Sequence, residues 1–235
     1  MMQPYYDHDG ITIYHGDCRE ILPTLGEMDI AITSPPYNIG AVHHNNKSRH
    51  SPYPDNLPES TYQDMQIFVL RLLHGRVKSV FYNHKNRIRD GIEVSPRTWL
   101  DKTPWTCRQS LVWVNGGPNH DPCRFYPKTE RVYWLAKPDT PWLENRKYWD
   151  VLECSPDVVS LAGKDHTRSF PLSLAQKILG VAPWANRALD PFMGSGTTLV
   201  AAKNLGRQAV GIEIQEKYCE IAVKRLAQEV LPFAV

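Results

Sequence analysis

Paired cysteines and a strong net charge are both missing from this 235-residue chain. Its five cysteines lie far apart and form no Cys-x-x-Cys pair, which argues against a disulfide framework or a bound zinc ion and favours a reducing compartment. The formal net charge of only +2 argues against a uniformly basic, polyanion-binding surface. Any contact with nucleic acid must therefore come from local basic clusters.

Long apolar runs are missing as well. No stretch of about 18 apolar residues occurs, and the opening segment MMQPYYDHDG does not lead from basic residues into an apolar run. We therefore expect a cytoplasmic protein that makes no contact with membranes. With 42% hydrophobic and 22% charged residues the chain has the composition of a folded protein, and its length favours one domain over two.

What the chain does contain is an alternation of strand-like and helix-like segments, which predicts an α/β fold with a mostly parallel sheet and helices on both faces. Apolar, β-prone runs predict strands at 11–14, 28–33, 77–82, 110–114, 131–136, 188–189 and 209–212. Helical spacing predicts helices at 62–73, 96–100, 172–179, 197–205 and 215–230. Residues 40–60 and the basic run 83–91 are predicted as loops, and 137–168 as an irregular insertion.

A first motif lies in the C-terminal third, in the order strand, DPFMGSGTT, helix, strand, acid. This order is typical of the half-fold that binds an adenosine-containing cofactor at the carboxyl ends of parallel strands. Gly194 and Gly196 allow a tight turn that a ligand can approach, and Glu213 at the next strand end can accept hydrogen bonds from both ribose hydroxyls. A nicotinamide site would want a third glycine where Leu199 stands. The alternative is a turn whose glycines serve structure alone.

The second motif is TSPPYN, residues 33–38. Pro35 and Pro36 end the preceding strand and fix the backbone, so that the Ser34 hydroxyl and the Pro35 carbonyl can accept hydrogens from the exocyclic amino group of a base. Such an amine is a poor nucleophile until its hydrogens are held, because its lone pair is delocalised into the ring. Tyr37 offers a ring on which a base flipped out of the duplex can stack. The alternative is a rigid turn with a purely structural role.

With both motifs in place, the chain resembles the beta class of DNA amino-methyltransferases, in which the catalytic motif precedes the cofactor motif. The resemblance rests on TSPPYN and on LDPFMGSGTTLVAAKNLGRQAVGIE, and it covers most of the chain. It implies a Rossmann-like, S-adenosylmethionine-dependent methyltransferase fold in permuted order, with a catalytic half at 1–136, a small target-recognition insertion at 137–165 and a cofactor half at 166–235. It also implies direct transfer of a methyl group to the amino group of a flipped base in double-stranded DNA, without a covalent enzyme intermediate.

The same resemblance implies roles for individual side chains. Asp17 of HGDC would accept from the cofactor's adenine, Asp190 would meet its ammonium group, and Phe192 would line the adenosine pocket. The residues that match the cofactor loop are Asp190, Phe192, Gly194, Ser195, Gly196 and Thr197. DHTRSFPLSLA stands where the family usually has a His-Pro-Thr-type segment, but Thr167 replaces the proline, so contacts at 166–170 do not carry over.

The choice of base turns on Ser34. Adenine enzymes mostly carry Asp at that position, so Ser34 favours the N4 amino group of cytosine and leaves the N6 amino group of adenine as the alternative. Two alternatives come from other classes. A protein or RNA amino-methyltransferase would more often carry Asn there, and a non-catalytic nucleic-acid-binding module would have no need of an intact Tyr37 and Glu213.

Contact with DNA is expected from two basic clusters, for which a solvated surface is the alternative. The first comprises Lys85, Arg87 and Arg89, and the second comprises Lys47 and Arg49. Base recognition is expected from the insertion, whose candidate side chains are Trp142, Arg146, Lys147 and Trp149. Because the insertion is short, we expect a short target sequence or the help of a second copy in a homodimer.

Overall fold

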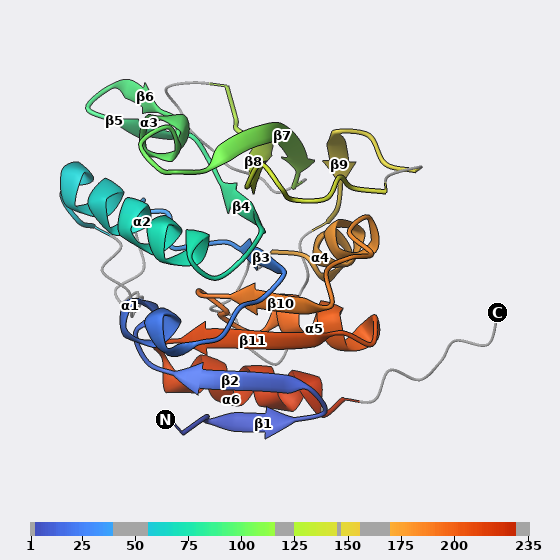
Figure 1. Cartoon of the computed structure of the whole chain (residues 1–235). Helices are drawn as coiled ribbons and strands as arrows, with labels where there is room; N and C mark the ends of the chain where they lie inside the picture. Colours follow the sequence, from blue (N-terminus) through green and yellow to red (C-terminus); the bar gives the residue numbers. More distant parts are fainter. Residues whose placement is uncertain (1–2, 40–55, 116–124, 145–146, 156–169, 229–235) are drawn as a thin grey trace.

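A computed structural model describes residues 3–39, 56–115, 125–144, 147–155 and 170–228 (Figure 1). Its centre is a nine-stranded sheet in the order β1-β2-β11-β10-β3-β4-β8-β7-β9. The strands are β1 (Tyr6–His8), β2 (Ile11–His15), β3 (Ile30–Thr33), β4 (Ser79–His84), β7 (Thr106–Val114), β8 (Thr129–Ala136), β9 (Val151–Glu153), β10 (Arg187–Asp190) and β11 (Gln208–Glu213).

Most neighbouring strands of this sheet are parallel, as predicted. The run β2, β11, β10, β3, β4 is parallel throughout. β8 lies antiparallel between β4 and β7, and β1 lies antiparallel to β2. The carboxyl ends of the five parallel strands therefore meet along one side of the sheet, which we call the carboxyl edge, and the amino end of β8 reaches the same edge.

Helices cover both faces of the sheet, which confirms the predicted layers (Figure 1). They are α1 (Cys18–Ile21), α2 (Glu59–His74), α3 (Arg97–Leu100), α4 (Leu172–Gly180), α5 (Thr197–Asn204) and α6 (Glu216–Leu226), with a 3₁₀ turn at Leu22–Thr24. α4, α5 and α6 share one buried cluster, and α1, α2 and α3 share the other. β3 shows why both faces need a cover, since Ile30 and Ile32 point into the first cluster and Ala31 into the second.

The chain changes direction between β10 and β3. These strands are parallel neighbours, yet β10 continues into α5 on one face and β3 leads on to α2 on the other. A crevice opens at the carboxyl end of such a switch point, because the two outgoing connections diverge. Both sequence motifs begin there.

The prediction that residues 83–91 and 137–168 are irregular is wrong in part. Residues 83–91 are not a basic loop: β4 continues to His84, and β5 (Arg87–Arg89) pairs with β6 (Ile92–Val94) across a turn at Asp90 and Gly91, whose φ angles are 50° and 77°. Within 137–168, β9 joins the sheet parallel to β7. Strands of three residues are too short to show a period in the sequence. Over the described ranges, no helix combines the length and apolar character that crossing a bilayer requires.

Candidate active site

The two motifs lie side by side at the carboxyl edge. Ala188 and Leu189 of β10 pair with Ile30 and Ala31 of β3. At the start of α5 the Thr198 hydroxyl lies 2.8 Å from Asp190 Oδ2 and 3.2 Å from the carbonyl oxygen of Ile32, which is 166 residues away along the chain. The two motifs, which lie far apart in the sequence, therefore fold against each other.

Four polar side chains from three places in the chain meet behind the proline turn. Ser34 Oγ lies 2.9 Å from the Tyr37 hydroxyl oxygen and 3.0 Å from Asn83 Oδ1. Tyr37 Oη lies 2.6 Å from Asn83 Oδ1 and 2.8 Å from Glu130 Oε2. Asn83 Nδ2 donates to the Arg131 carbonyl oxygen at 3.0 Å, which turns the amide oxygen toward the hydroxyls. We call Ser34, Tyr37, Asn83 and Glu130 the acceptor cluster.

The backbone of the proline turn is held from both sides. The Tyr62 hydroxyl of α2 lies 2.7 Å from the carbonyl oxygen of Pro36. Asn38 is buried in a left-handed conformation with φ of 54°, and its amide bonds the backbone N–H and C=O of Leu57 at 2.7 and 2.9 Å. The Pro35 carbonyl remains the predicted second acceptor for an amino group.

Tyr37 has a buried hydroxyl and a partly exposed ring. Burial, followed by the charge of Glu130, raises the pKa of Tyr37 well above its usual value, so the hydroxyl stays protonated. The ring centroid lies 4.6 Å from that of His84 at a 45° tilt, and Lys85 Nζ lies 5.4 Å from it. Stacking of a base on this ring stays a prediction.

On the cofactor side, Asp190 is buried and already bonded. Its Oδ1 accepts from the Phe192 backbone N–H at 3.1 Å, and its Oδ2 lies next to Thr198. Burial raises the pKa of Asp190 to about 6 against the lowering effect of these hydrogen bonds, and the charge of Glu213 adds to the increase. Its predicted contact with an ammonium group stays a prediction.

Glu213 ends β11 beside the glycine turn. It is 2% exposed; Oε2 accepts from the Gly194 backbone N–H at 2.9 Å and Oε1 from that of Gln215 at 2.8 Å. Gly194 has φ of 53°, and a Cβ built there would meet no atom within 4 Å. The turn therefore leaves room for a ligand, and two carboxylates stand at the neighbouring strand ends, as an adenosine-containing cation requires.

The rest of the glycine turn is fixed by α6. Gly196 has φ of 83°, and a Cβ there would lie 2.8 Å from Ala222 Cβ, so close helix packing also requires this glycine. Arg225 Nη1 donates to the Ser195 carbonyl oxygen at 2.7 Å, to Ser195 Oγ at 3.0 Å and to Thr197 Oγ1 at 3.1 Å. The side chains of Ser195 and Thr197, which are predicted to bind the cofactor, thus face Arg225, a residue that no sequence motif marks.

Asp17 caps α1 just after β2. Its carboxylate accepts from the Arg19 backbone N–H at 2.8 Å and from Arg19 Nε at 3.0 Å. Hydrogen bonding to the Arg19 side chain lowers the pKa of Asp17 and keeps it charged. The preceding Gly16 N–H donates to the Glu213 carbonyl oxygen at 2.9 Å, which sets Asp17 near the glycine turn. Its predicted contact with adenine stays a prediction.

The predicted phosphate contact of Arg87 is wrong. Arg87 is 3% exposed, its guanidinium bonds both carboxylate oxygens of Glu59 at 2.7 and 2.9 Å, and it lies over the rings of Tyr62 and Trp99. A bidentate pair stacked on aromatic rings is a structural use of arginine. Arg89 Nε also lies 3.8 Å from Glu59, whereas Lys85 stays partly exposed beside Tyr37.

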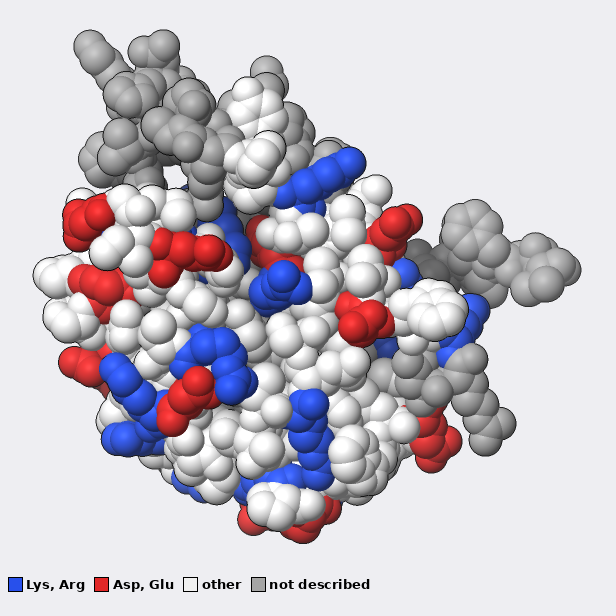
Figure 2. All heavy atoms as spheres, turned by 90° about the horizontal axis from the view of Figure 1, so that it is seen from above, with Lys and Arg blue, Asp and Glu red and all other residues white. Residues whose placement is uncertain are grey.

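Other predicted DNA contacts fall elsewhere. Lys47, Arg49, Arg146 and residues 166–169 lie outside the described residues. Trp142 follows the carboxyl end of β8 and contacts Trp134 and Arg108, so it lies toward the edge of the sheet opposite Tyr37. On the face shown in Figure 2, lysines and arginines are interspersed with acidic residues rather than gathered in one field.

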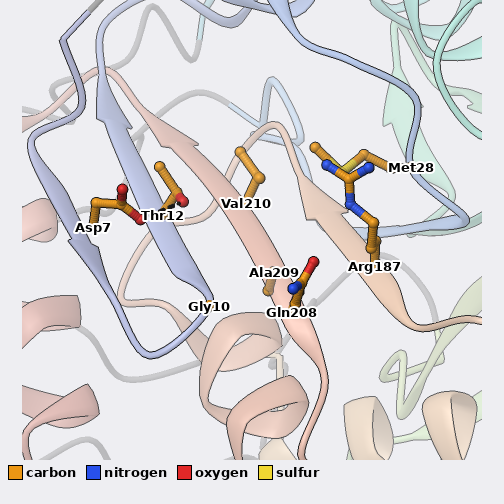
Figure 3. A pocket seen from close by; sticks show the side chains of 8 residues that line it. All are labelled: Asp7, Gly10, Thr12, Met28, Arg187, Gln208, Ala209 and Val210. Atoms are coloured by element: carbon orange, nitrogen blue, oxygen red, sulfur yellow. Dashed lines mark hydrogen bonds between the residues drawn. The ribbon is translucent and has the colours of Figure 1, made fainter.

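A pocket opens away from the motifs (Figure 3). It is lined by Asp7, Gly10, Thr12, Met28, Arg187, Gln208, Ala209 and Val210. Because Arg187 and Gln208 begin their strands, this pocket lies at the amino ends, opposite the carboxyl edge. In the described part of the chain, no group of three or more His, Cys, Asp or Glu is placed to hold a metal ion.

The acceptor cluster contains two side chains that the sequence analysis missed. Asn83 is the polar residue that ends β4, next to β3, and Glu130 stands at the amino end of antiparallel β8. A polar residue directly after the apolar run 77–82 was a usable signal for Asn83. Glu130 had none, because its position depends on the antiparallel pairing of β8 with β4.

Comparison with known proteins agrees with this arrangement. A family model described as DNA methylase matches residues 28–224. The type II methyltransferase M.ScaI of Streptomyces caespitosus is 28% identical, over 97% of this chain and 84% of the relative. Among solved structures, the PvuII DNA methyltransferase (cytosine-N4-specific) has a TM-score of 0.80 at 19% identity, covering 97% of this chain and 90% of that one. M1.HpyAVI in complex with SAM has a TM-score of 0.64 at 25% identity, covering 93% and 100%.

Proposed function

This chain belongs to the DNA methylase family of amino-methyltransferases, and on that premise we propose that it transfers a methyl group from S-adenosylmethionine to the N4 amino group of a cytosine flipped out of double-stranded DNA. Methylation of an amino group of DNA with S-adenosylmethionine is the activity of this family. Cytosine as the base, and the roles of single residues, are our proposal. A protein or RNA substrate and a non-catalytic role do not agree with the matching family model, which is described as DNA methylase.

The carboxyl edge fits this cofactor. Glu213 is a carboxylate that can accept from ribose hydroxyls, and the open space beside Gly194 admits a ligand close to the backbone. When bound, S-adenosylmethionine supplies a methyl group on a positively charged sulfur, which an amine can displace directly. Asp190, Phe192 and Asp17 are the remaining residues that would hold it.

The single observation that carries the proposal is the position of Ser34. It follows β3, the strand that pairs with β10 of the cofactor half, and its hydroxyl belongs to the acceptor cluster. There Ser34 and the Pro35 carbonyl would hold the hydrogens of the amino group while Tyr37 supports the ring of the base. Holding two reactants in a reactive arrangement supplies most of the rate acceleration that such a reaction needs.

The test is to methylate unmodified duplex DNA in vitro and to identify the modified nucleoside by mass spectrometry. We expect N4-methylcytosine, and Ser34→Ala serves as a control that should reduce its formation. Detection of N6-methyladenine instead would identify adenine as the target base and would leave the family activity intact. The absence of any methylated base would contradict the enzymatic proposal itself.

A further inference from the structure

The acceptor cluster has fewer hydrogens than its contacts require. Four oxygen–oxygen contacts of 2.6–3.0 Å join Ser34, Tyr37, Asn83 and Glu130. The two hydroxyls supply one hydrogen each, while the Asn83 oxygen and the Glu130 carboxylate supply none. Two contacts therefore have no hydrogen between their oxygens. The cluster therefore has more acceptor capacity than its own hydrogens fill, and a donor such as an exocyclic amino group can use it.

A chain of short contacts leads from Ser34 to Glu130. Ser34 Oγ lies 2.9 Å from Tyr37 Oη, which lies 2.8 Å from Glu130 Oε2. Beyond Tyr37 the other acceptor is Asn83, whose amide is not a base. Glu130 is the carboxylate at the end of this chain, and its half-buried position gives it a route to solvent.

Asn115 supports Glu130 from behind. It is 4% exposed, and its Nδ2 donates to Glu130 Oε1 at 3.3 Å. Its own Oδ1 is buried and has no hydrogen-bond partner among the residues that the structure describes. An unsatisfied amide oxygen costs free energy, and it can be satisfied when Glu130 or a ligand brings a hydrogen to it.

Besides Lys85, which is a cation, His84 is a titratable side chain beside Tyr37. Its Nε2 lies 2.7 Å from the Tyr62 hydroxyl and its Nδ1 2.7 Å from the Lys85 carbonyl oxygen, so both nitrogens are engaged. Burial lowers the pKa of His84 to about 3, so it does not take up a proton near neutral pH.

We propose that Glu130 takes up, through Tyr37 and Ser34, the proton that the target amino group loses on methylation. The proposal rests on the proposed function, because Ser34 must hold that amino group. As the nitrogen–methyl bond forms, the methyl–sulfur bond breaks with its electron pair on sulfur, and the nitrogen becomes positive. It then gives a proton to Ser34 Oγ, while the Ser34 hydrogen passes to Tyr37 and the Tyr37 hydrogen to Glu130.

This step removes charge rather than creating it. The methylated amine becomes neutral, both hydroxyls regain one hydrogen each, and the Glu130 carboxylate becomes a neutral acid. Before the transfer, the same carboxylate stabilises the positive charge that develops on the nitrogen. Glu130 acts through Tyr37 and is therefore a positioning residue and proton acceptor rather than a group that touches the base.

The test is single-turnover methylation by Glu130→Gln, with enzyme and S-adenosylmethionine in excess over DNA. Glutamine keeps the shape and the contact with Tyr37 but takes up no proton. We expect the rate to fall about 100-fold, while KM for either substrate changes less than about 3-fold. Glu130→Asp should recover part of the rate, and formate should restore activity to Glu130→Ala where chloride does not.

Glu153→Gln is the matched control, because Glu153 is an exposed carboxylate on β9 at the same side of the sheet. It should methylate at the wild-type rate. A wild-type rate in Glu130→Gln would overturn the proton-transfer role and leave the proposed function intact. The same conclusion would follow if Glu130→Ala folds but formate does not restore its methylation rate. If the wild-type enzyme methylates no base in DNA, the proton-transfer role and the proposed function are both wrong.

Discussion

The two halves of the carboxyl edge treat their polar groups in opposite ways. On the cofactor side the carboxylates of Asp190 and Glu213 accept from backbone N–H groups of the loops that follow β10 and β11, and Arg225 donates to two hydroxyls. On the side of the proline turn, oxygens face oxygens and hydrogens are missing. The first half is held in shape by hydrogen bonds within the protein, whereas the second keeps acceptor capacity for an entering donor.

Tyr37→Ala should have the largest effect, and it should act on the side of the proline turn alone. Without its hydroxyl and ring, the side of the proline turn loses the centre of its cluster and the platform for the base. We expect methyl transfer to fall about 1,000-fold while the cofactor Kd changes less than about 3-fold. Single-turnover assays and a cofactor titration measure the two quantities. A parallel loss of cofactor binding would show that the halves are not separate.

Asp190→Asn should change how the free energy of unfolding depends on pH. Because the pKa of Asp190 is raised from 3.8 to about 6 in the folded state, the folded protein binds this proton more tightly than the unfolded chain does. Its contribution to the free energy of unfolding is therefore present at low pH and falls by about 3 kcal/mol as the pH rises from about 4 to 6.

The asparagine variant should lack this fall, because its amide does not titrate. Its nitrogen can donate to Thr198, as the protonated acid would, which frees the Thr198 hydrogen for the Ile32 carbonyl. Denaturant unfolding at pH 4, 5, 6 and 7 measures the difference between variant and wild type. A difference independent of pH would show that Asp190 is not the titrating group.

Glu213→Gln should have the reverse effect of Tyr37→Ala, because it changes the cofactor side alone. The amide replaces a charged acceptor of two backbone N–H groups by a neutral one that also donates. We expect the cofactor Kd to rise about 10- to 100-fold, with methyl transfer at saturating cofactor within a few-fold of wild type. Isothermal titration and rates at several cofactor concentrations check this; a lost maximal rate with unchanged Kd would contradict it.

Arg225→Lys should have the smallest effect. Lysine replaces the guanidinium that binds Ser195 and Thr197 by a single ammonium group, which costs about 1 kcal/mol of unfolding free energy and a few-fold in cofactor Kd. Thermal unfolding and titration measure both, with the exposed neighbour Lys224→Gln as control. If the control loses as much stability as the variant, the Arg225 contacts are not what fixes the turn.

The two halves also differ in how much of them could be predicted from the sequence. The motifs were found at the right strand ends because prolines and glycines mark the backbone locally. The acceptor cluster was found only in part, since Asn83 and Glu130 lie 46 and 93 residues from Tyr37 and meet it through the sheet. Arg87 looked like a surface cation because its partner Glu59 stands 28 residues earlier. Local pattern predicts strand ends well and side-chain partners poorly.

The contact of Thr198 with Ile32 also bears on how such genes can be rearranged. Between β3 and β10 the two halves are joined by main-chain pairing, by the Thr198 hydroxyl and by the Asp29 carboxylate, which accepts from the backbone N–H groups of Asn186 and Arg187. A recombination that placed the coding region for 187–228 ahead of that for 3–39 would leave the same strands as neighbours. The order of these segments in the gene can therefore change while β3 and β10 remain neighbours in the folded protein.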